Sequence, residues 1–285
     1  MAHQLNPQQQ AALNYIDGPL LVLAGAGSGK TSVITGKIAY LIEQCGIPSR
    51  NIYAVTFTNK AAREMKDRVG KLLSGSESKG LSVSTFHNLG LNIIRHEIKK
   101  LGFKPGFSIM DQEDCRNILK ELLVRHSDLD EKLIDNIQYT ISDWKNSLLQ
   151  PGQAVSAANS TGEQTIAMLY ERYQRALRAY NAVDFDDLIM IPVCLFREQH
   201  EVLAKWQQRI RYMLVDEYQD TNLAQYELVR TLVKEKQALT VVGDDDQSIY
   251  AWRGARPENL MQLQEDFPAL KVIKLEQNYR STGRI

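Results

Sequence analysis

The sequence has few of the features that stabilise small secreted folds or anchor proteins in membranes. Its 285 residues include only three cysteines, Cys45, Cys115 and Cys194, which lie far apart and form no CxxC pair. This argues against a disulfide framework or a zinc knuckle and fits a reducing compartment. No stretch approaches the ~18 apolar residues of a membrane span, and the N-terminus has no apolar signal region. We therefore expect a soluble cytoplasmic protein with no membrane partner.

Net charge is also missing, because 34 basic residues balance 34 acidic ones. Overall charge therefore indicates no particular partner, and any contact with nucleic acid must come from a local surface. Hydrophobic residues make up 44% and charged residues 24%, which is typical of a globular chain. The length allows one large domain or two ordinary ones.

Six short apolar runs rich in branched residues predict buried β-strands. Helical patterns lie between most of them, for example at 31–44 and 59–73. Such alternation predicts a parallel sheet covered by helices. The six runs are 19–25, 52–57, 81–86, 212–217, 239–244 and 271–276.

The interval between the third and fourth runs contains no convincing strand pattern. It indicates a helical subdomain inserted into the α/β domain, with a linker at 148–163 rich in turn-forming residues. The chain stops at Ile285, soon after a strand signal, and we expect the natural protein to continue. The helices predicted in the interval are 87–101, 111–126, 130–147, 163–180 and 184–199.

A glycine-rich segment, LAGAGSGKTSV, follows the first predicted strand and precedes a helix, as a phosphate-binding loop requires. Gly27 and Gly29 would let backbone N–H groups face a phosphate. Lys30 would reach the β- and γ-phosphates of ATP, and Thr31 would hold Mg²⁺. The alternative is a glycine-rich turn with an incidental lysine. The ATP-binding loop is predicted to comprise Ala24, Gly25, Ala26, Gly27, Ser28, Gly29, Lys30 and Thr31.

A pair of acids, Asp216 and Glu217, ends the apolar run at 212–217. Parallel sheets bind ligands at the carboxyl ends of their strands. Asp216 suits a ligand to Mg²⁺, and Glu217 suits the base that orients and deprotonates water. Taken alone, two acids at a strand end are more simply solvated surface groups. Together with the phosphate loop upstream, they predict both parts of one hydrolytic site.

Eight motifs together resemble those of superfamily I DNA helicases of the UvrD/Rep/PcrA type, and their residues are most similar to the bacterial Rep branch. They occur in the family's order and span essentially the whole chain. The resemblance implies ATP-driven 3′-to-5′ movement along single-stranded DNA. It also implies a RecA-like P-loop sheet with an inserted all-helical subdomain. The motifs are LNPQQQAA, AGAGSGKT, TFTNKAA, STFH, DFDDL, VDEYQDTN, VVGDDDQSIYAWRGA and LEQNYRS.

The resemblance assigns further residues to the nucleotide. Gln9 matches the glutamine that recognises adenine, and its amide offers a donor and an acceptor together. Tyr279 matches an aromatic residue that stacks on adenine. Arg280 matches the arginine that reaches the γ-phosphate, and Gln247 matches the γ-phosphate sensor. Ser32 departs from the pattern, since many relatives have arginine there, which puts part of the base contact in doubt.

The resemblance places two strand-end segments on the path of single-stranded DNA, which needs stacking faces and backbone donors. Without it, Phe57 is equally well read as a core residue and His87 as a helix-capping residue. His87 has no partner at metal-ligand spacing, so zinc is rejected. The residues assigned to DNA from these segments are Thr56, Phe57, Thr58, Asn59, Thr85 and His87.

The segment VVGDDDQSIYAWRGA carries acids, aromatic residues and an arginine within a short stretch. Tyr250 and Trp252 would present faces to DNA bases, and Arg253 would bridge toward the acids of the ATP site or the DNA backbone. Because the segment would touch both ATP and DNA, we expect it to couple them. Asp244 would orient neighbouring donors or lie near the metal, whereas the two acids after it receive no role.

The acids of DFDDL precede a helical run, where a helix N-terminus favours negative charge. We therefore expect a structural role for them and not catalysis. The domain division that follows is a RecA-like motor domain at 1–87 plus 196–276, a helical insertion at 88–195, and the start of a second RecA-like domain at 277–285.

Two rival functions remain open. One is the same motor with another task, such as the motor half of a nuclease-coupled recombination helicase. The other is a nucleotide-gated DNA-binding module without useful turnover. An RNA motor is a weaker rival. Because a stepping motor needs a second RecA-like domain, we expect this chain alone to bind nucleotide weakly, hydrolyse little and unwind nothing. A nucleoid-associated location follows from the helicase resemblance.

Overall fold

The computed structural model describes residues 5–25, 27–73, 77–123, 131–244 and 258–277. The chain divides into two compact units. Unit 1 comprises Met1–Leu89, Gln199–Asn222 and Val229–Ile285, and unit 2 comprises Gly90–Glu198 and Leu223–Leu228. Helix α4 (Phe86–His96) and helix α12 (Leu223–Val233) contribute residues to both units.

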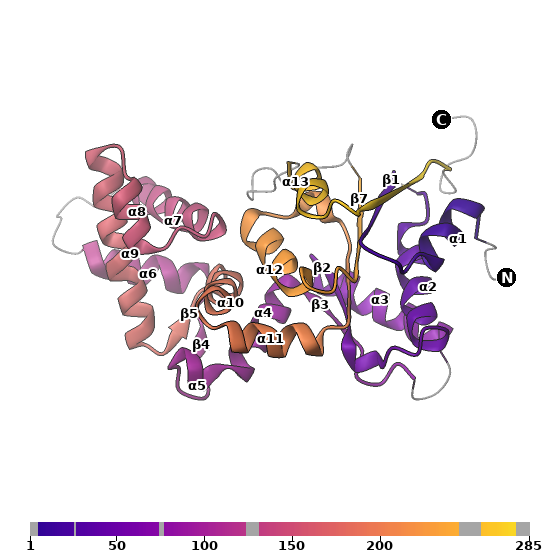
Figure 1. Cartoon of the computed structure of the whole chain (residues 1–285). Helices are drawn as coiled ribbons and strands as arrows, with labels where there is room; N and C mark the ends of the chain where they lie inside the picture. Colours follow the sequence, from indigo (N-terminus) through magenta and orange to yellow (C-terminus); the bar gives the residue numbers. More distant parts are fainter. Residues whose placement is uncertain (1–4, 26, 74–76, 124–130, 245–257, 278–285) are drawn as a thin grey trace. The chain divides into compact units, whose positions relative to one another are not determined.

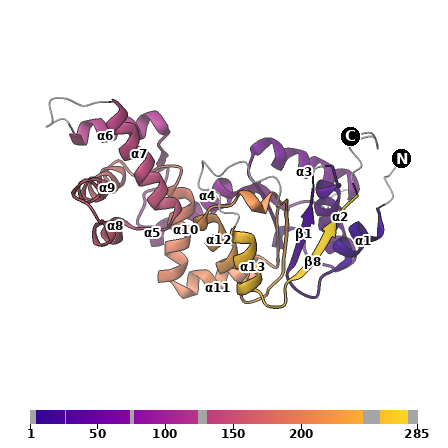
Figure 2. The same cartoon turned by 90° about the horizontal axis from the view of Figure 1, so that it is seen from above.

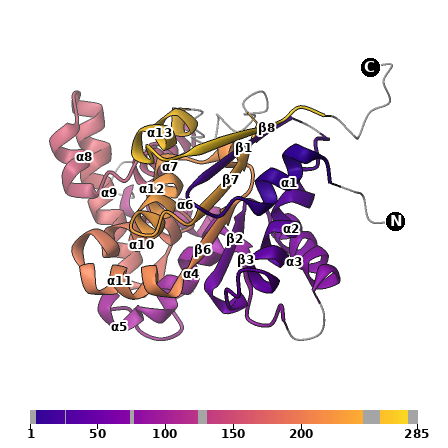
Figure 3. The same cartoon turned by 45° about the vertical axis from the view of Figure 1, so that its right-hand side comes forward.

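Unit 1 contains a six-stranded sheet in the order β3-β2-β6-β7-β1-β8, and every neighbouring pair in it is parallel (Figure 3). The six predicted strands are confirmed, each within two residues of its predicted ends. Because all strands run the same way, their carboxyl ends meet at one edge of the sheet. The strands are β1 (Leu20–Ala24), β2 (Ile52–Thr56), β3 (Ser82–Thr85), β6 (Tyr212–Val215), β7 (Leu239–Gly243) and β8 (Lys271–Leu275).

Helices of unit 1 cover both faces of this sheet (Figures 2 and 3). Helices α1 (Pro7–Asn14), α2 (Lys30–Glu43) and α3 (Asn59–Leu72) lie along one face. Helices α11 (His200–Arg209) and α13 (Glu258–Asp266) lie on the other. Short 3-10 turns occur at Ser49–Asn51 and Tyr218–Asp220.

The core of unit 1 forms because the central strands are apolar on both sides. Every residue of β6 and of β7 is buried, as expected for parallel strands with helices on each face. Val33, Ile34 and Ile38 of α2 pack into the same cluster as Leu20 and Val22 of β1. Burial of each such side chain contributes roughly 1.5–3 kcal/mol relative to exposure. This packing fixes the first turn of α2 relative to the end of β1.

In its described residues, unit 2 is helical apart from one small strand pair (Figure 1). Its main cluster joins side chains of α6, α7, α8 and α9, including Leu119, Ile137 and Tyr170. The remaining elements are α5 (Ile98–Leu101), α6 (Gln112–Leu123), α7 (Glu131–Asn146), α8 (Pro151–Ala157), α9 (Thr161–Ala179), α10 (Asp187–Glu198), β4 (Ser108–Ile109) and β5 (Ala182–Val183).

The linker expected at 148–163 is wrong in part, because helix α8 occupies its middle. Pro151 stands in the first turn of α8, and Gln150 and Gln153 form a reciprocal capping box. A proline is tolerated there because that N–H has no helical partner. The parallel pair β4–β5 was also not predicted, since two residues are too short to show a period.

The predicted domain division at 87/88 and 195/196 stays a prediction. The two compact units show how the chain packs, but they do not show which unit is a motor domain and which is an insertion. Among the helices that the structure describes, none is both long and apolar enough to cross a bilayer.

Candidate nucleotide site

The loop between β1 and α2 has the backbone geometry that a bound phosphate requires. Gly27 has φ 78° and Gly29 has φ 84°, which is left-handed backbone that glycine adopts at little cost. Gly29 is the N-cap of α2 and supplies no side-chain cap to that helix. The first N–H groups of α2 are therefore available, together with the helix dipole, to an anion. Ser28 shapes the turn by donating its hydroxyl to the Gly25 carbonyl at 2.8 Å. Ala26 lies outside the described residues.

Gln9 lies directly against this loop, in α1. Its Nε2 donates to the Ser28 carbonyl at 2.9 Å, and its Oε1 accepts from the Asn6 N–H at 3.0 Å. A Cβ at Gly29 would come within 2.5 Å of the Gln9 Nε2, so this contact also requires glycine at position 29. One N–H and one lone pair of the Gln9 amide remain for a further partner. The adenine role of Gln9 stays a prediction; the structure adds a role in supporting the loop.

Asp216 and Glu217 follow β6 at the same edge of the sheet. Asp216 is buried, and its Oδ1 accepts the Glu217 N–H at 3.0 Å. Burial, and then the neighbouring Glu217 charge, raise the pKa of Asp216 to about 6. Glu217 has φ 52° and ψ 44°, which is uncommon for a residue other than glycine. Backbone strain of this kind concentrates at functional sites.

Lys30 joins the loop to two acids from different strands. Its Nζ lies 3.5 Å from Glu217 Oε2 and 3.6 Å from Asp244 Oδ2. Strand β7 lies between β6 and β1, so the acid after β7 and the acid after β6 both approach Lys30. Sequence reasoning expected Glu217 here and left Asp244 between two roles. The structure places Asp244 beside the lysine that would hold the phosphates.

Gln219 is a site residue that sequence reasoning missed. It is 2% exposed, its Nε2 donates to Glu217 Oε2 at 2.9 Å, and its Oε1 accepts from the Asp244 N–H at 3.0 Å. The sequence shows a glutamine two residues after the predicted base. It does not show that this glutamine is buried or that it contacts Asp244, because that contact depends on the order of the strands. Asp220 also lies close, and burial followed by the Glu217 charge raises its pKa to about 6.

The donors at this edge fit a magnesium ion shared with phosphate oxygens. Such an ion needs only one or two protein ligands, with water and phosphate completing the shell. Thr31 in the first turn of α2 and the Asp216 carboxylate would supply that number. A cation beside Asp216 would also offset the burial that raises its pKa. Within the described ranges, no three His, Cys, Asp or Glu side chains form a metal cluster.

The two segments assigned to DNA lie side by side, because Thr56 of β2 pairs in register with Thr85 of β3. The rings of Phe57 and Phe86 have centroids 5.3 Å apart. Asn59 Oδ1 accepts from Asn88 Nδ2 at 3.1 Å, which adds an exposed amide that was not predicted.

Several of these side chains have local structural roles. The Thr58 hydroxyl caps α3 by accepting from Ala61 N–H at 3.1 Å. The Thr85 hydroxyl accepts from Asn88 N–H at 3.2 Å. Thr56 and Thr85 are buried, whereas Phe57 and His87 are partly exposed. The structure thus brings the two segments together, while their DNA contacts remain predictions.

Two of the three acids of DFDDL, Asp184 and Asp187, are buried rather than solvated, whereas Asp186 is partly exposed. Asp184 Oδ2 and Asp187 Oδ1 lie 2.6 and 2.8 Å from Lys145 Nζ. Asp187 N–H donates to Asp184 Oδ1 at 2.9 Å, and Tyr173 donates to Asp184 Oδ2 at 2.9 Å. The structural role expected for these acids fits this arrangement, since Asp187 lies in the first turn of α10, and the buried lysine is a partner that was not predicted.

Besides Ala26, six predicted site residues lie outside the described residues. They are Gln247, Tyr250, Trp252, Arg253, Tyr279 and Arg280.

A phosphate loop at the head of α2, facing acids at the ends of two parallel strands, defines a P-loop nucleotide-binding domain with a RecA-like α/β sheet. The chain belongs to the UvrD/REP helicase family, since the model of the UvrD/REP helicase N-terminal domain matches residues 5–268.

Named relatives agree with that assignment. The ATP-dependent DNA helicase Rep of Escherichia coli (strain K12) is 57% identical over 282 residues, which is 99% of this chain and 42% of that protein. Rep of Salmonella typhimurium is 56% identical over 99% of this chain and 42% of its own length. The ATP-dependent DNA helicase PcrA of Bacillus subtilis is 47% identical over 99% of this chain and 38% of its own length. The chain thus spans about two fifths of these relatives.

Proposed function

We propose that this chain is the ATP-binding half of a motor that moves 3′ to 5′ along single-stranded DNA and separates the strands. The observation that carries the proposal is the approach of Lys30 Nζ to Glu217 Oε2, 3.5 Å apart, at the edge where β1 and β6 end. It joins a phosphate-binding cation to a candidate base. Relatives at up to 57% identity are named ATP-dependent DNA helicases, which supports the same conclusion.

ATP would lie over the first turn of α2. Lys30 would hold the β- and γ-phosphates, and the N–H groups of the loop would bind their oxygens. Thr31 and Asp216 would hold Mg²⁺, which neutralises phosphate charge when it is bound. Glu217 would orient the attacking water and accept its proton. Gln9 would contact the adenine edge with the capacity that its loop contacts leave.

The remaining parts of the cycle are assigned from the family motifs. Tyr279 would stack on the base, and Arg280 and Gln247 would stabilise and sense the γ-phosphate. A second RecA-like domain would close over the nucleotide. The 42% coverage of the Rep relative leaves room for such a domain in a longer protein.

Single-stranded DNA would cross the ends of β2 and β3. Phe57, partly exposed and in contact with Phe86, supplies a ring face, and the Asn59–Asn88 amide pair supplies polar groups. Trp252, Tyr250 and Arg253 would add to this track and couple it to the nucleotide. We place the protein in the cytoplasm, associated with the nucleoid, where its DNA would be found.

A Glu→Gln exchange at position 217 tests the proposal in the complete protein. ATP hydrolysis is measured with and without single-stranded DNA. We expect DNA to stimulate the parent, and Glu217→Gln to lower kcat by roughly 10²–10⁴-fold, the contribution of a general base. Nucleotide binding should persist, because Lys30 and the loop are intact.

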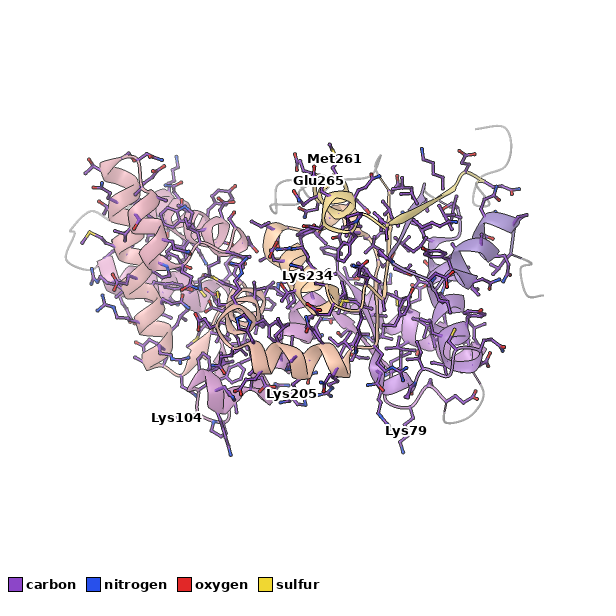
Figure 4. All side chains as sticks on the ribbon, viewed as in Figure 1. Lys79, Lys104, Lys205, Lys234, Met261 and Glu265 are labelled. Atoms are coloured by element: carbon purple, nitrogen blue, oxygen red, sulfur yellow. The ribbon has the colours of Figure 1, made fainter. Side chains whose placement is uncertain are left out.

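Glu265→Gln is the matched control. Glu265 and the exposed Met261 lie close together on α13 (Figure 4). The control should leave kcat within about twofold of the parent, since surface exchanges away from such sites have small effects. If single-stranded DNA does not stimulate ATP hydrolysis, the proposed motor function is contradicted and the nucleotide-gated binding module is favoured.

A further inference from the structure

Four residues at the sheet edge form a closed ring of polar contacts. Lys30 Nζ lies 3.5 Å from Glu217 Oε2, and Gln219 Nε2 donates to that same oxygen at 2.9 Å. Gln219 Oε1 accepts from the Asp244 N–H at 3.0 Å, and Asp244 Oδ2 lies 3.6 Å from Lys30 Nζ. The ring therefore connects the phosphate loop, the end of β6 and the end of β7.

The chemistry of the ring requires a primary amide at position 219. Glu217 needs a donor and the Asp244 N–H needs an acceptor, and an amide side chain offers both at once. Gln219 is 2% exposed, so its amide is held in place by its surroundings. The Glu217 side chain is 38% exposed and would otherwise have freedom to rotate.

The two contacts of Glu217 would respond differently to ATP. Lys30 is the group that phosphates attract, so a bound nucleotide would draw it away from the carboxylates. Gln219 carries no charge and has no such reason to move. Its donor would keep Glu217 oriented when the lysine contact is lost. The same amide therefore joins the base to Asp244 at the end of β7.

We propose that Gln219 is a positioning residue, which holds the Glu217 carboxylate in its reactive orientation and ties it to the end of β7 through the Asp244 N–H. The proposal rests on the proposed ATPase function for its effect on rate. The link between Gln219 and Asp244 does not depend on that function, because it follows from the observed hydrogen bond. Two readouts therefore test it.

The first readout is steady-state ATP hydrolysis by the complete protein with saturating single-stranded DNA. Gln219→Leu should lower kcat by roughly 10–100-fold, as loss of residues that orient a reacting group does. The KM for ATP should change by less than about threefold, because the binding groups are untouched. Gln174→Leu is the matched control, since Gln174 Nε2 donates to the Asp187 carboxylate in unit 2 at 3.0 Å. It removes a similar bond within unit 2 that involves no residue assigned to the nucleotide, and it should leave kcat unchanged.

A double-mutant cycle separates positioning from general damage. If Gln219 acts through Glu217, adding Gln219→Leu to Glu217→Gln should lower the single-turnover rate by less than about twofold. A second loss as large as the first would overturn the positioning role.

The second readout is hydrogen exchange of the Asp244 amide in the 285-residue chain. Gln219→Leu removes its acceptor and should accelerate exchange, whereas Gln174→Leu should not. Gln219→Glu keeps an acceptor for Asp244 but removes the donor to Glu217, so it should lose rate and retain protection. Unchanged exchange in Gln219→Leu would overturn the tie to β7. If the parent shows no DNA-stimulated hydrolysis, the proposed function fails, and the exchange result still decides the tie.

Discussion

Both units contain a lysine that faces two acids, and the two arrangements differ in closeness and exposure. In unit 1, Lys30 is 3.5 Å from Glu217 and 3.6 Å from Asp244, and its side chain is 12% exposed. In unit 2, Lys145 is 2.6 Å from Asp184 and 2.8 Å from Asp187, and its side chain is 0% exposed. A ligand can replace the long contacts of Lys30, whereas nothing can reach Lys145. Distance and access thus separate a candidate binding site from a structural tie made of the same groups.

Electrostatics support this distinction. Burial alone lowers the pKa of Lys145, but the charges of Asp184 and Asp187 outweigh burial and hold that pKa above its ordinary value. The lysine therefore stays charged in the folded protein and needs both acids. The rings of Tyr173 and Tyr170 also lie 5.3 and 5.8 Å from its Nζ.

The largest expected effect comes from breaking the tie in unit 2. Lys145→Met leaves two buried acids without their cation, and we expect the free energy of unfolding to fall by about 3–5 kcal/mol. Urea denaturation of the 285-residue chain, parent and variant, measures the change in the free energy of unfolding. Lys104 projects into solvent (Figure 4) and supplies the control, because Lys104→Met should stay within about 0.5 kcal/mol. A loss under about 1 kcal/mol for Lys145→Met would show that Lys145 is not a structural tie of the kind that separates it from Lys30.

A third lysine sharpens the comparison, because Lys37 is buried among carbonyl groups. Its Nζ donates to the Ala12 carbonyl at 2.8 Å and also to the Tyr15 carbonyl. Burial lowers the pKa of Lys37 from 10.5 to about 7, and Cys45 acts in the opposite direction. The Tyr212 ring lies 5.8 Å from the Lys37 Nζ.

The sign of the pH effect follows from this lowered pKa. Between pH 7 and about 10 the unfolded chain holds a proton at Lys37 that the folded chain lacks, so stability rises with pH. Below pH 7 Lys37 is protonated in both the folded and the unfolded chain, so the full stability cost of burying its charge is present. We expect the difference between parent and Lys37→Met to change by up to about 1.4 kcal/mol per pH unit. Urea titrations at several pH values measure it, with exposed Lys79→Met as the control (Figure 4). Identical slopes in parent and Lys37→Met would contradict the prediction.

The smallest effect on stability is expected at Lys30. Both of its contacts are long and Glu217 is partly open to solvent, although Asp244 is buried, so Lys30→Met should change the free energy of unfolding by about 1–2 kcal/mol, less than Lys145→Met. Its effect on ligand binding should be larger, about 1.5–3 kcal/mol, or on the order of 10–100-fold in the Kd for ATP. Calorimetry and denaturation on the same samples give both values, and Lys79→Met should alter neither. A large loss of stability without a change in ATP affinity would make Lys30 a second structural tie.

The sequence was sufficient for the strands and the loop because their signals are local. An apolar run followed by glycines and a lysine predicts a strand, a turn and a helix without reference to the rest of the chain. The same is true of the acids after β6. Helix α8 escaped prediction because its proline and glycine are typical of turns, although the capping box around Pro151 was a usable signal.

The sequence predicted that the phosphate loop and Glu217 share one site, but it did not predict the other contacts between distant elements. Gln219 and Asp244 are 25 residues apart, and Lys145 and Asp187 are 42 apart. Which acid meets which lysine depends on strand order and helix packing, and residue type alone does not encode either.

By itself, the sequence determined the parallel sheet, the phosphate loop and the family, since each rests on short patterns in a fixed order. Only the tertiary structure decided that Asp244 approaches Lys30 and that Gln219 bridges Glu217 to β7. The physical reason is the position of β7 between β6 and β1, which brings the ends of three strands together. Tertiary structure likewise made Asp184 and Asp187 part of a buried tie, because helix α7 brings Lys145 and helix α9 brings Tyr173 to the start of helix α10.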